Sequence, residues 1–254
     1  MKKYEGYLID LDGTLYRGSE MIPDAVEFIK RLQQAERRYL YLTNNSSRLP
    51  EQVAERLRAF GFPAKPEQVY TSALATANYL KEELSSPYVY VIGEEGLKRA
   101  IEEAGCTLTE NNPEVVVVGI DRQFTYEKMK KASLFIRQGA QLIGSNPDKA
   151  LPTEIGLLPG AGSLIAAIAT ATGVKPLIIG KPEPIILRYA LEKLGSSPEN
   201  TLIIGDNLET DILAGVNSQI DTLLVYSGVT TPEMYEHSSI SATYQVASLS
   251  EWTI

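Results

Sequence analysis

Short apolar runs of strand length alternate along the chain with stretches in which apolar residues recur every three or four positions. The runs predict buried strands, and the periodic stretches predict amphipathic helices. The predicted strands are residues 7–9, 39–42, 69–71, 88–92, 115–118, 141–143, 177–179, 201–204 and 222–225. The predicted helices are residues 23–34, 50–60, 73–84 with Ser72 as the N-cap, 94–104, 126–138, 164–172, 184–194 and 209–216. This alternation is typical of βαβ units and predicts an α/β fold with a mainly parallel sheet.

Polar residues follow four of the predicted strands, at the point where each strand ends. In chain order they are Asp10 with Asp12, Thr43, Lys181, and Asp206 with Asp211. Each of them taken alone has an ordinary explanation as a turn or a helix cap. Four in order, each behind an apolar strand, favour a ligand site, because ligands of open α/β sheets bind just beyond the carboxyl ends of the strands.

The chemistry that suits these residue types is phosphoryl transfer. Mg²⁺ prefers oxygen ligands, so the predicted metal ligands are the carboxylates of Asp10 and Asp206 and the backbone carbonyl near Asp12. Asp10 is the candidate nucleophile that forms an aspartyl-phosphate. Asp12 is placed to protonate the leaving alkoxide and later to activate water. The Thr43 hydroxyl and Lys181 are expected to hold the phosphate oxygens.

Three neighbouring residues complete the predicted site. Asn44 and Asn207 directly follow Thr43 and Asp206 and are grouped with the residues that bind phosphate. Asp211 lies five positions beyond Asp206. We expect it to orient metal-bound water or the lysine rather than to bind the metal directly.

The four segments resemble the four motifs of the haloacid dehalogenase superfamily of phosphatases. They are Asp10-Leu11-Asp12-Gly13-Thr14, Thr43-Asn44, Lys181-Pro182, and Gly205-Asp206 followed by Asp211. The resemblance implies a Rossmann-like core, dependence on Mg²⁺, Asp10 as the nucleophile and Asp12 as the general acid and base.

The spacing of the motifs resembles one branch of that superfamily, the NagD-like or p-nitrophenylphosphatase-like branch (subclass IIA, with a C2-type cap). The segments that support it are residues 43–46, 145–148, 159–163 and 180–182. The branch implies a catalytic core of residues 1–76 and 177–254, with a smaller α/β cap domain, residues 77–176, inserted between the second and third motifs. It also implies that Asn146 and Asp148 lie on a cap loop that helps to select the substrate, although a simple polar turn explains these two residues equally well.

Composition narrows the class of partner. The chain has 254 residues, a net charge of −8 and a pI of about 4.9, so it repels phosphate backbones and a nucleic-acid polymer is not an expected partner. Its single cysteine excludes an internal disulfide and favours a reducing cytoplasm. The first apolar run is interrupted by Asp10 and Asp12, unlike a signal peptide, and the apolar stretch 164–174 is too short to span a bilayer. A soluble, cytoplasmic protein without a membrane partner is predicted.

The predicted function is Mg²⁺-dependent hydrolysis of small phosphorylated metabolites, with sugar phosphates favoured. Nucleoside monophosphates and pyridoxal phosphate are the alternative substrates within the branch. A non-catalytic regulatory module that binds a metabolite is the alternative from a different class. A dehalogenase would need neither Asp12 nor Asp206 in these roles, and nothing in the sequence calls for the second phosphate site of a phosphotransferase. The expected assembly is a homodimer, because relatives form cap-mediated dimers.

Overall fold

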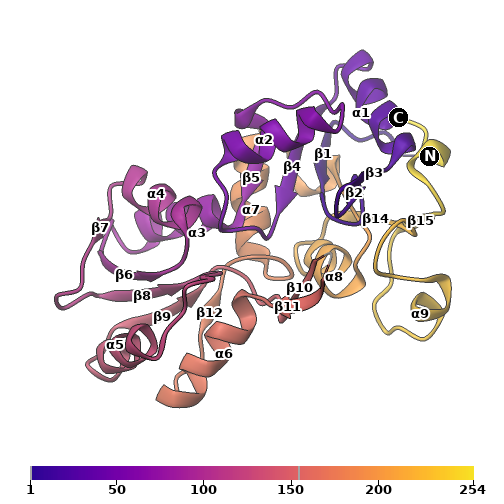
Figure 1. Cartoon of the computed structure of the whole chain (residues 1–254). Helices are drawn as coiled ribbons and strands as arrows, with labels where there is room; N and C mark the ends of the chain where they lie inside the picture. The colour runs from indigo at the N-terminus through magenta and orange to yellow at the C-terminus, as the bar shows by residue number, and fades with distance from the viewer. Residues whose placement is uncertain (1, 154) are drawn as a thin grey trace. The chain divides into compact units, whose positions relative to one another are not determined.

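The chain forms two compact units, which are coloured along the sequence in Figure 1. This computed structural model describes residues 2–153 and 155–254. Unit 1 contains Met1–Thr43, Pro50–Tyr70 and Lys181–Ile254, and unit 2 contains Asn44–Leu49 and Thr71–Gly180. Each unit has a parallel sheet with helices, so the predicted α/β class is confirmed. The functional division into a catalytic core of residues 1–76 and 177–254 and a cap of residues 77–176 stays a prediction.

Unit 1 is built on a six-stranded sheet with the order β15-β14-β13-β1-β4-β5. The strands are β1 (Gly6–Ile9), β4 (Arg38–Thr43), β5 (Val69–Thr71), β13 (Thr201–Gly205), β14 (Asp221–Val225) and β15 (Tyr244–Val246). β1 pairs in parallel with both β4 and β13, and the parallel pairing continues through β14 to β15. The carboxyl end of β1 therefore lies in the middle of one sheet edge. A short antiparallel hairpin, β2 (Tyr16–Arg17) with β3 (Glu20–Met21), follows β1.

Helices cover both faces of this sheet, which explains the nearly continuous apolar strands. They are α1 (Pro23–Gln34), α2 (Pro50–Ala59), α7 (Pro184–Leu194), α8 (Leu213–Asn217) and α9 (Pro232–Glu236), with a π-helical turn η3 (Leu208–Ile212) and the 3-10 turns η1 (Pro66–Gln68), η2 (Pro198–Asn200) and η4 (Leu249–Glu251). Side chains of β1 alternate between the two faces. Tyr7 and Ile9 belong to the core that includes Phe28 of α1 and Leu57 of α2. Leu8 is equally buried on the opposite face.

Unit 2 is built on a five-stranded parallel sheet with the order β12-β9-β8-β6-β7. Its strands are β6 (Tyr88–Ile92), β7 (Thr107–Leu108), β8 (Val115–Val118), β9 (Gln141–Gly144) and β12 (Leu177–Ile178). The helices α3 (Ser72–Glu83) and α4 (Glu95–Glu103) lie on one side of the sheet, and α5 (Tyr126–Arg137) and α6 (Ala161–Thr172) lie on the other (Figure 1). An antiparallel hairpin of β10 (Ala150–Thr153) and β11 (Gly156–Pro159) precedes α6.

Most of the predicted elements are confirmed to within a residue or two at their ends, and the differences have local causes. The helix expected over residues 209–216 begins as the π-helical turn η3, and α6 begins at Ala161 rather than at residue 164. The N-cap of α3 is Thr71, whose hydroxyl accepts the N–H of Leu74 at 3.2 Å. Ser72 was the wrong choice for this cap, because its hydroxyl instead donates to the carbonyl of Asn44 at 2.6 Å. The short strands β2, β3, β7, β10, β11 and β15 and the short helix α9 were not predicted.

Residues 2–153 and 155–254 contain no helix with both the length and the apolar character that a bilayer span requires.

Candidate active site

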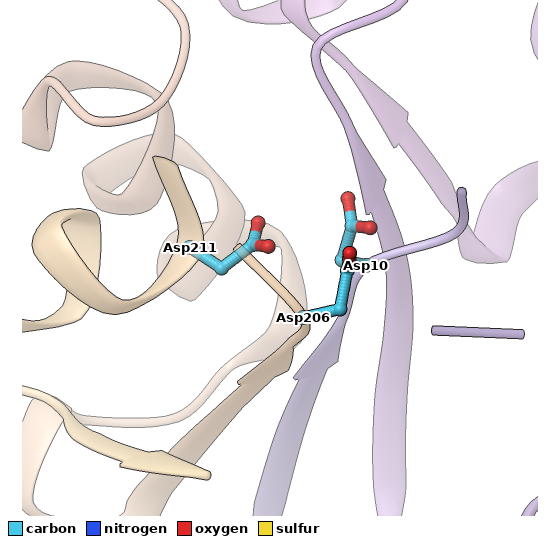
Figure 2. A group of neighbouring side chains, drawn as sticks. All are labelled: Asp10, Asp206 and Asp211. Carbon is cyan, nitrogen blue, oxygen red and sulfur yellow. The ribbon is translucent and has the colours of Figure 1, made fainter. Parts of the chain in front are cut away.

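Three carboxylates converge at the carboxyl ends of two neighbouring strands of unit 1. Asp10 directly follows β1, Asp206 directly follows β13, and Asp211 lies in η3. The two strands end level with each other, because Ile9 pairs with Ile204 and the Asp10 N–H donates to the Ile204 carbonyl at 2.9 Å. Each carboxylate offers an oxygen that lies within 4.8 Å of the others. Figure 2 shows the three side chains directed toward one another.

Lys181 joins this group as a cation held between two of the carboxylates. Its Nζ atom lies 2.6 Å from Asp10 Oδ1 and 2.6 Å from Asp211 Oδ1. The lysine side chain is only 2% exposed, so these charge-assisted hydrogen bonds replace the water that it loses on folding. The structure thus brings together four of the predicted site residues from motifs that are far apart in the sequence.

The carboxylate of Asp206 is held against the backbone. Its Oδ2 accepts the Val229 N–H at 2.6 Å, and the Thr14 hydroxyl donates to its Oδ1 at 3.3 Å. A Cβ atom added at Gly13 or Gly228 would lie 2.3 Å or 2.0 Å from Oδ2, so only glycine leaves room for this carboxylate. Gly13 also has a φ of +91°, which favours glycine. The contacts of residues 228 and 229 with Asp206 were not predicted from the sequence, where a glycine shortly after β14 is the one feature that could have indicated them.

Asp211 is positioned in the same way by the turn that contains it. A Cβ atom at Gly205 would lie 2.2 Å from its Cγ, and its Oδ2 accepts the Asn207 N–H at 3.2 Å. The Asn207 side chain accepts the Glu209 N–H at 2.9 Å and so caps η3. Asp211 therefore contacts Lys181 as expected, while the side chain of Asn207, grouped with the phosphate-binding residues, is engaged in a helix cap.

Asp12 is exposed and forms an isolated β-bridge with Tyr16. Its Oδ2 accepts the hydroxyl of the buried Tyr16 at 3.3 Å. The Arg56 guanidinium lies over the ring of Tyr16, 4.9 Å from its centroid. The contact of Tyr16 with Asp12 was not predicted, because tyrosines scattered along a sequence are usually explained by packing.

The other predicted site residues are divided between the two units. Thr43 is the last residue of β4 and is buried in unit 1, whereas Asn44 is the first residue of unit 2. Within unit 2, the Asn44 side chain donates to Asp148 Oδ1 at 3.1 Å, and the Asn146 side chain donates to the Asn44 carbonyl at 2.9 Å. The two residues predicted to select the substrate therefore bind the residue that follows Thr43.

The buried charges shift the ionisation of the group. Burial, followed by the charge of Asp211, raises the pKa of Asp10 well above its ordinary value, and Lys181 opposes this shift. The same two causes raise the pKa of Asp206 to about 7. Burial tends to lower the pKa of Lys181, but Asp10 and Asp211 outweigh this effect and raise it.

Burial is the first cause of the raised pKa values of Asp10 and Asp206, and an excess of negative charge adds to it. Three carboxylates around one ammonium leave two negative charges uncompensated. A divalent cation would balance them, and a set of ligands made only of oxygen atoms suits a hard cation such as Mg²⁺. The residues present therefore fit the expected metal.

The raised pKa of Asp206 predicts how metal binding depends on pH. Folding without metal strengthens proton binding by this carboxyl, so its contribution to stability is complete below its ordinary pKa of 3.8 and is lost as the pH rises through about 7. Mg²⁺ requires the ionised form. The rise in Tm caused by MgCl₂ relative to EDTA should therefore be small near pH 5 and should grow toward about pH 8. A rise that is the same at every pH, or that persists in Asp206→Asn, contradicts the assignment.

The close contact of Gly228 with Asp206 predicts a second effect. Gly228→Ala would displace the carboxylate, because the new Cβ would lie 2.0 Å from Oδ2. The affinity for Mg²⁺, measured by isothermal titration calorimetry, should fall by about tenfold to a hundredfold. The control Met234→Ala changes a half-exposed side chain of α9 and should leave the affinity unchanged. Unchanged binding in Gly228→Ala would show that this carboxylate does not hold the metal.

Comparison with known proteins supports the same chemistry. The profile of the haloacid dehalogenase-like hydrolases matches residues 7–107, and the HAD-hydrolase-like profile matches residues 178–252. The 5′-nucleotidase YutF of Bacillus subtilis (strain 168) is 51% identical over 252 residues, which cover 99% of this chain and 98% of that protein. The acid sugar phosphatase of Staphylococcus aureus (strain USA300) is 46% identical over 252 residues, which cover 99% of this chain and 97% of that protein.

The solved structure of NagD from E. coli K-12 matches with a TM-score of 0.94 at 34% identity and covers 99% of both chains. The NagD-like resemblance inferred from the motifs is thus confirmed. Full-length relatives named as a 5′-nucleotidase and an acid sugar phosphatase, together with the two matching profiles, establish that the chain belongs to the haloacid dehalogenase-like hydrolases and is a phosphoric monoester hydrolase.

Proposed function

We propose that this phosphatase depends on Mg²⁺ and hydrolyses small phosphomonoesters, sugar phosphates above all, through an aspartyl-phosphate on Asp10. The observation that carries the proposal is the ion pair of Lys181 with both Asp10 and Asp211, next to Asp206, at the carboxyl ends of β1 and β13. This arrangement combines a carboxylate nucleophile with a cation for phosphate oxygens and with a second carboxylate for a metal.

Asp10 attacks phosphorus with a carboxylate oxygen, and the bond between phosphorus and the ester oxygen breaks. The reaction needs the ionised form of Asp10. Lys181, whose Nζ lies 2.6 Å from Asp10 Oδ1, lowers the pKa of this carboxyl against the effect of burial. Asp12 protonates the departing alkoxide. Its exposed position allows exchange of that proton with solvent.

The second half of the reaction regenerates the enzyme. Asp12, now ionised, removes a proton from water, and the resulting hydroxide attacks phosphorus and releases the Asp10 carboxylate together with inorganic phosphate. The Thr43 hydroxyl and the Lys181 ammonium hold the phosphate oxygens during both steps. Asn44 contributes to this phosphate site through its backbone. Asn207 supports the site indirectly, because its N–H donates to Asp211 Oδ2 at 3.2 Å and its side chain caps η3.

The metal ligands are the carboxylates of Asp10 and Asp206 and the backbone carbonyl of Asp12. Mg²⁺, when bound, supplies positive charge beside the phosphoryl group and offsets the excess charge of the carboxylates. Asp211 acts on Lys181, which it holds at 2.6 Å, rather than as a ligand.

The names of two relatives support the proposed substrate class. The acid sugar phosphatase at 46% identity supports sugar phosphates, and the 5′-nucleotidase at 51% identity supports nucleoside monophosphates as a second candidate class. Both classes are small phosphate esters of an alcohol. We also propose that residues 77–176 act as the cap of a catalytic core formed by residues 1–76 and 177–254, that the protein acts in the cytoplasm, and that it forms a homodimer.

The proposed reaction is tested by phosphate release from a panel of esters with MgCl₂ or with EDTA. The panel contains hexose phosphates, nucleoside 5′-monophosphates, pyridoxal phosphate and p-nitrophenyl phosphate. Release should require Mg²⁺, and a sugar phosphate should have the highest kcat/KM. A nucleoside monophosphate at the top would replace the proposed substrate class by the second one. Equal release in EDTA would contradict the dependence on metal.

The nucleophile is tested by Asp10→Asn. The amide keeps the size of the side chain and can still accept the Lys181 hydrogen bond, but it lacks the charge that attacks phosphorus. The kcat should fall by at least about a thousandfold, and the protein should stay folded, because Asp211 still compensates the charge of Lys181. Asp24→Asn, an equivalent change at an exposed residue in the first turn of α1, should retain full activity. Substantial turnover by a folded Asp10→Asn protein would exclude the aspartyl-phosphate.

A further inference from the structure

The chain passes between unit 1 and unit 2 at four peptide bonds, and two of them adjoin residues of the proposed phosphate site. Thr43 precedes one passage and Lys181 follows another. A group of small buried residues of unit 2, here called the crossing cluster, lies at these passages. Its members are Asn44, Ser46, Ser72, Ser145, Asn146 and Gly180.

Asn146 is the centre of the crossing cluster. Its side chain is 4% exposed and donates to the Asn44 carbonyl at 2.9 Å and to the Ser145 hydroxyl at 3.0 Å. Its Oδ1 accepts the Asp148 N–H at 3.2 Å. Both the nitrogen and the oxygen of the amide therefore form hydrogen bonds inside unit 2. A side chain satisfied in this way suits a positioning role better than recognition of a substrate.

Gly180 brings a second passage against the first. Its N–H donates to the Ser145 carbonyl at 2.9 Å. A Cβ atom at this position would lie 2.6 Å from Asn44 Oδ1 and 2.9 Å from the Cβ of Asn146, so the backbone is in direct contact with both asparagines. Consecutive Cα atoms are about 3.8 Å apart. The positions of Asn44 and Gly180 therefore restrict the positions of the Cα atoms of Thr43, which precedes Asn44, and of Lys181, which follows Gly180.

Two serines complete the cluster. The Ser72 hydroxyl, one residue beyond the passage at Tyr70 and Thr71, donates to the Asn44 carbonyl at 2.6 Å. The Ser145 hydroxyl donates to the Ser46 hydroxyl at 3.1 Å. The Asn44 carbonyl thus accepts two hydrogen bonds from elements that are distant in sequence, which fixes the orientation of the peptide group that follows this residue.

We propose that Asn146 is a positioning residue of the phosphatase reaction. Through the Asn44 carbonyl and the Gly180 backbone, it sets the distance between Thr43 and Lys181. It does not recognise the leaving group of the substrate. This inference rests on the proposed roles of Thr43 and Lys181 in holding phosphate oxygens. It replaces the substrate-selecting role that the family resemblance implied for Asn146.

The test separates the positioning of the phosphate site from selection of the leaving group. Asn146→Asp keeps the shape of the side chain but removes the donor to the Asn44 carbonyl. Ser72→Ala removes a single donor to the same carbonyl and is a milder change. For each variant, kcat/KM is measured for four phosphomonoesters with different leaving groups. The inhibition constant of inorganic phosphate, which has no leaving group, and the Tm are measured as well.

Positioning predicts one pattern in both variants. In Asn146→Asp, kcat/KM should fall by about tenfold to a hundredfold, by a similar factor for all four esters, and the inhibition constant of phosphate should rise. Ser72→Ala should show a smaller change of the same kind. The matched control is Asp121→Asn, a buried polar residue of unit 2 that pairs with Lys128 at 2.6 Å. This variant should change neither the inhibition constant of inorganic phosphate nor the order of the esters by kcat/KM.

Four outcomes overturn the inference. A changed ranking of the esters with an unchanged phosphate constant would assign Asn146 to the leaving group. A lower Tm with an unchanged phosphate constant in the folded protein would show a role in stability alone. Lys181→Ala separates this inference from the proposed function. If phosphate binding is weaker in Lys181→Ala but unchanged in Asn146→Asp and Ser72→Ala, only the inference is overturned. If phosphate binding is unchanged in all three variants, the proposed function is overturned as well.

Discussion

The structure depends on the placement of one buried ammonium group between carboxylates. Lys181 is 2% exposed and lies 2.6 Å from both Asp10 and Asp211. Removing one partner from a buried ion pair typically costs about 3–5 kcal/mol, because a charge is left without compensation. The sheet makes the arrangement possible, since β1 and β13 are parallel neighbours and end at the same edge. The carboxylates outnumber the lysine, and this excess is what makes the group suitable for a divalent cation.

Close packing of the backbone holds these charges in place. Gly13 and Gly228 leave no space for a Cβ beside Asp206, and Gly205 leaves none beside Asp211. Carboxylates seated in this way against N–H groups have few alternative rotamers. Groups that are already oriented before the reaction do not have to reorganise when charge develops on the phosphoryl group.

The reaction class and the substrate have different structural origins. Full-length relatives at 51% and 46% identity carry the names of a 5′-nucleotidase and an acid sugar phosphatase. The carboxylates and Lys181 act on a phosphoryl group, which is common to both kinds of ester. They therefore determine the reaction, whereas the alcohol has to be recognised by other groups.

The sequence by itself determined the strands, most helices and the polar residues at the strand ends, because periodicity and strand termination are local properties. It also determined the family, through four short motifs. Only the tertiary structure decided which of those residues touch. The ion pair of Lys181 and Asp10 joins positions 171 apart in the chain. The contact of Gly228 with Asp206 and the choice of Thr71 over Ser72 as a cap also depend on neighbours that are distant in sequence. Such contacts are set by how the strands pair and how closely the backbones approach, which no local pattern records.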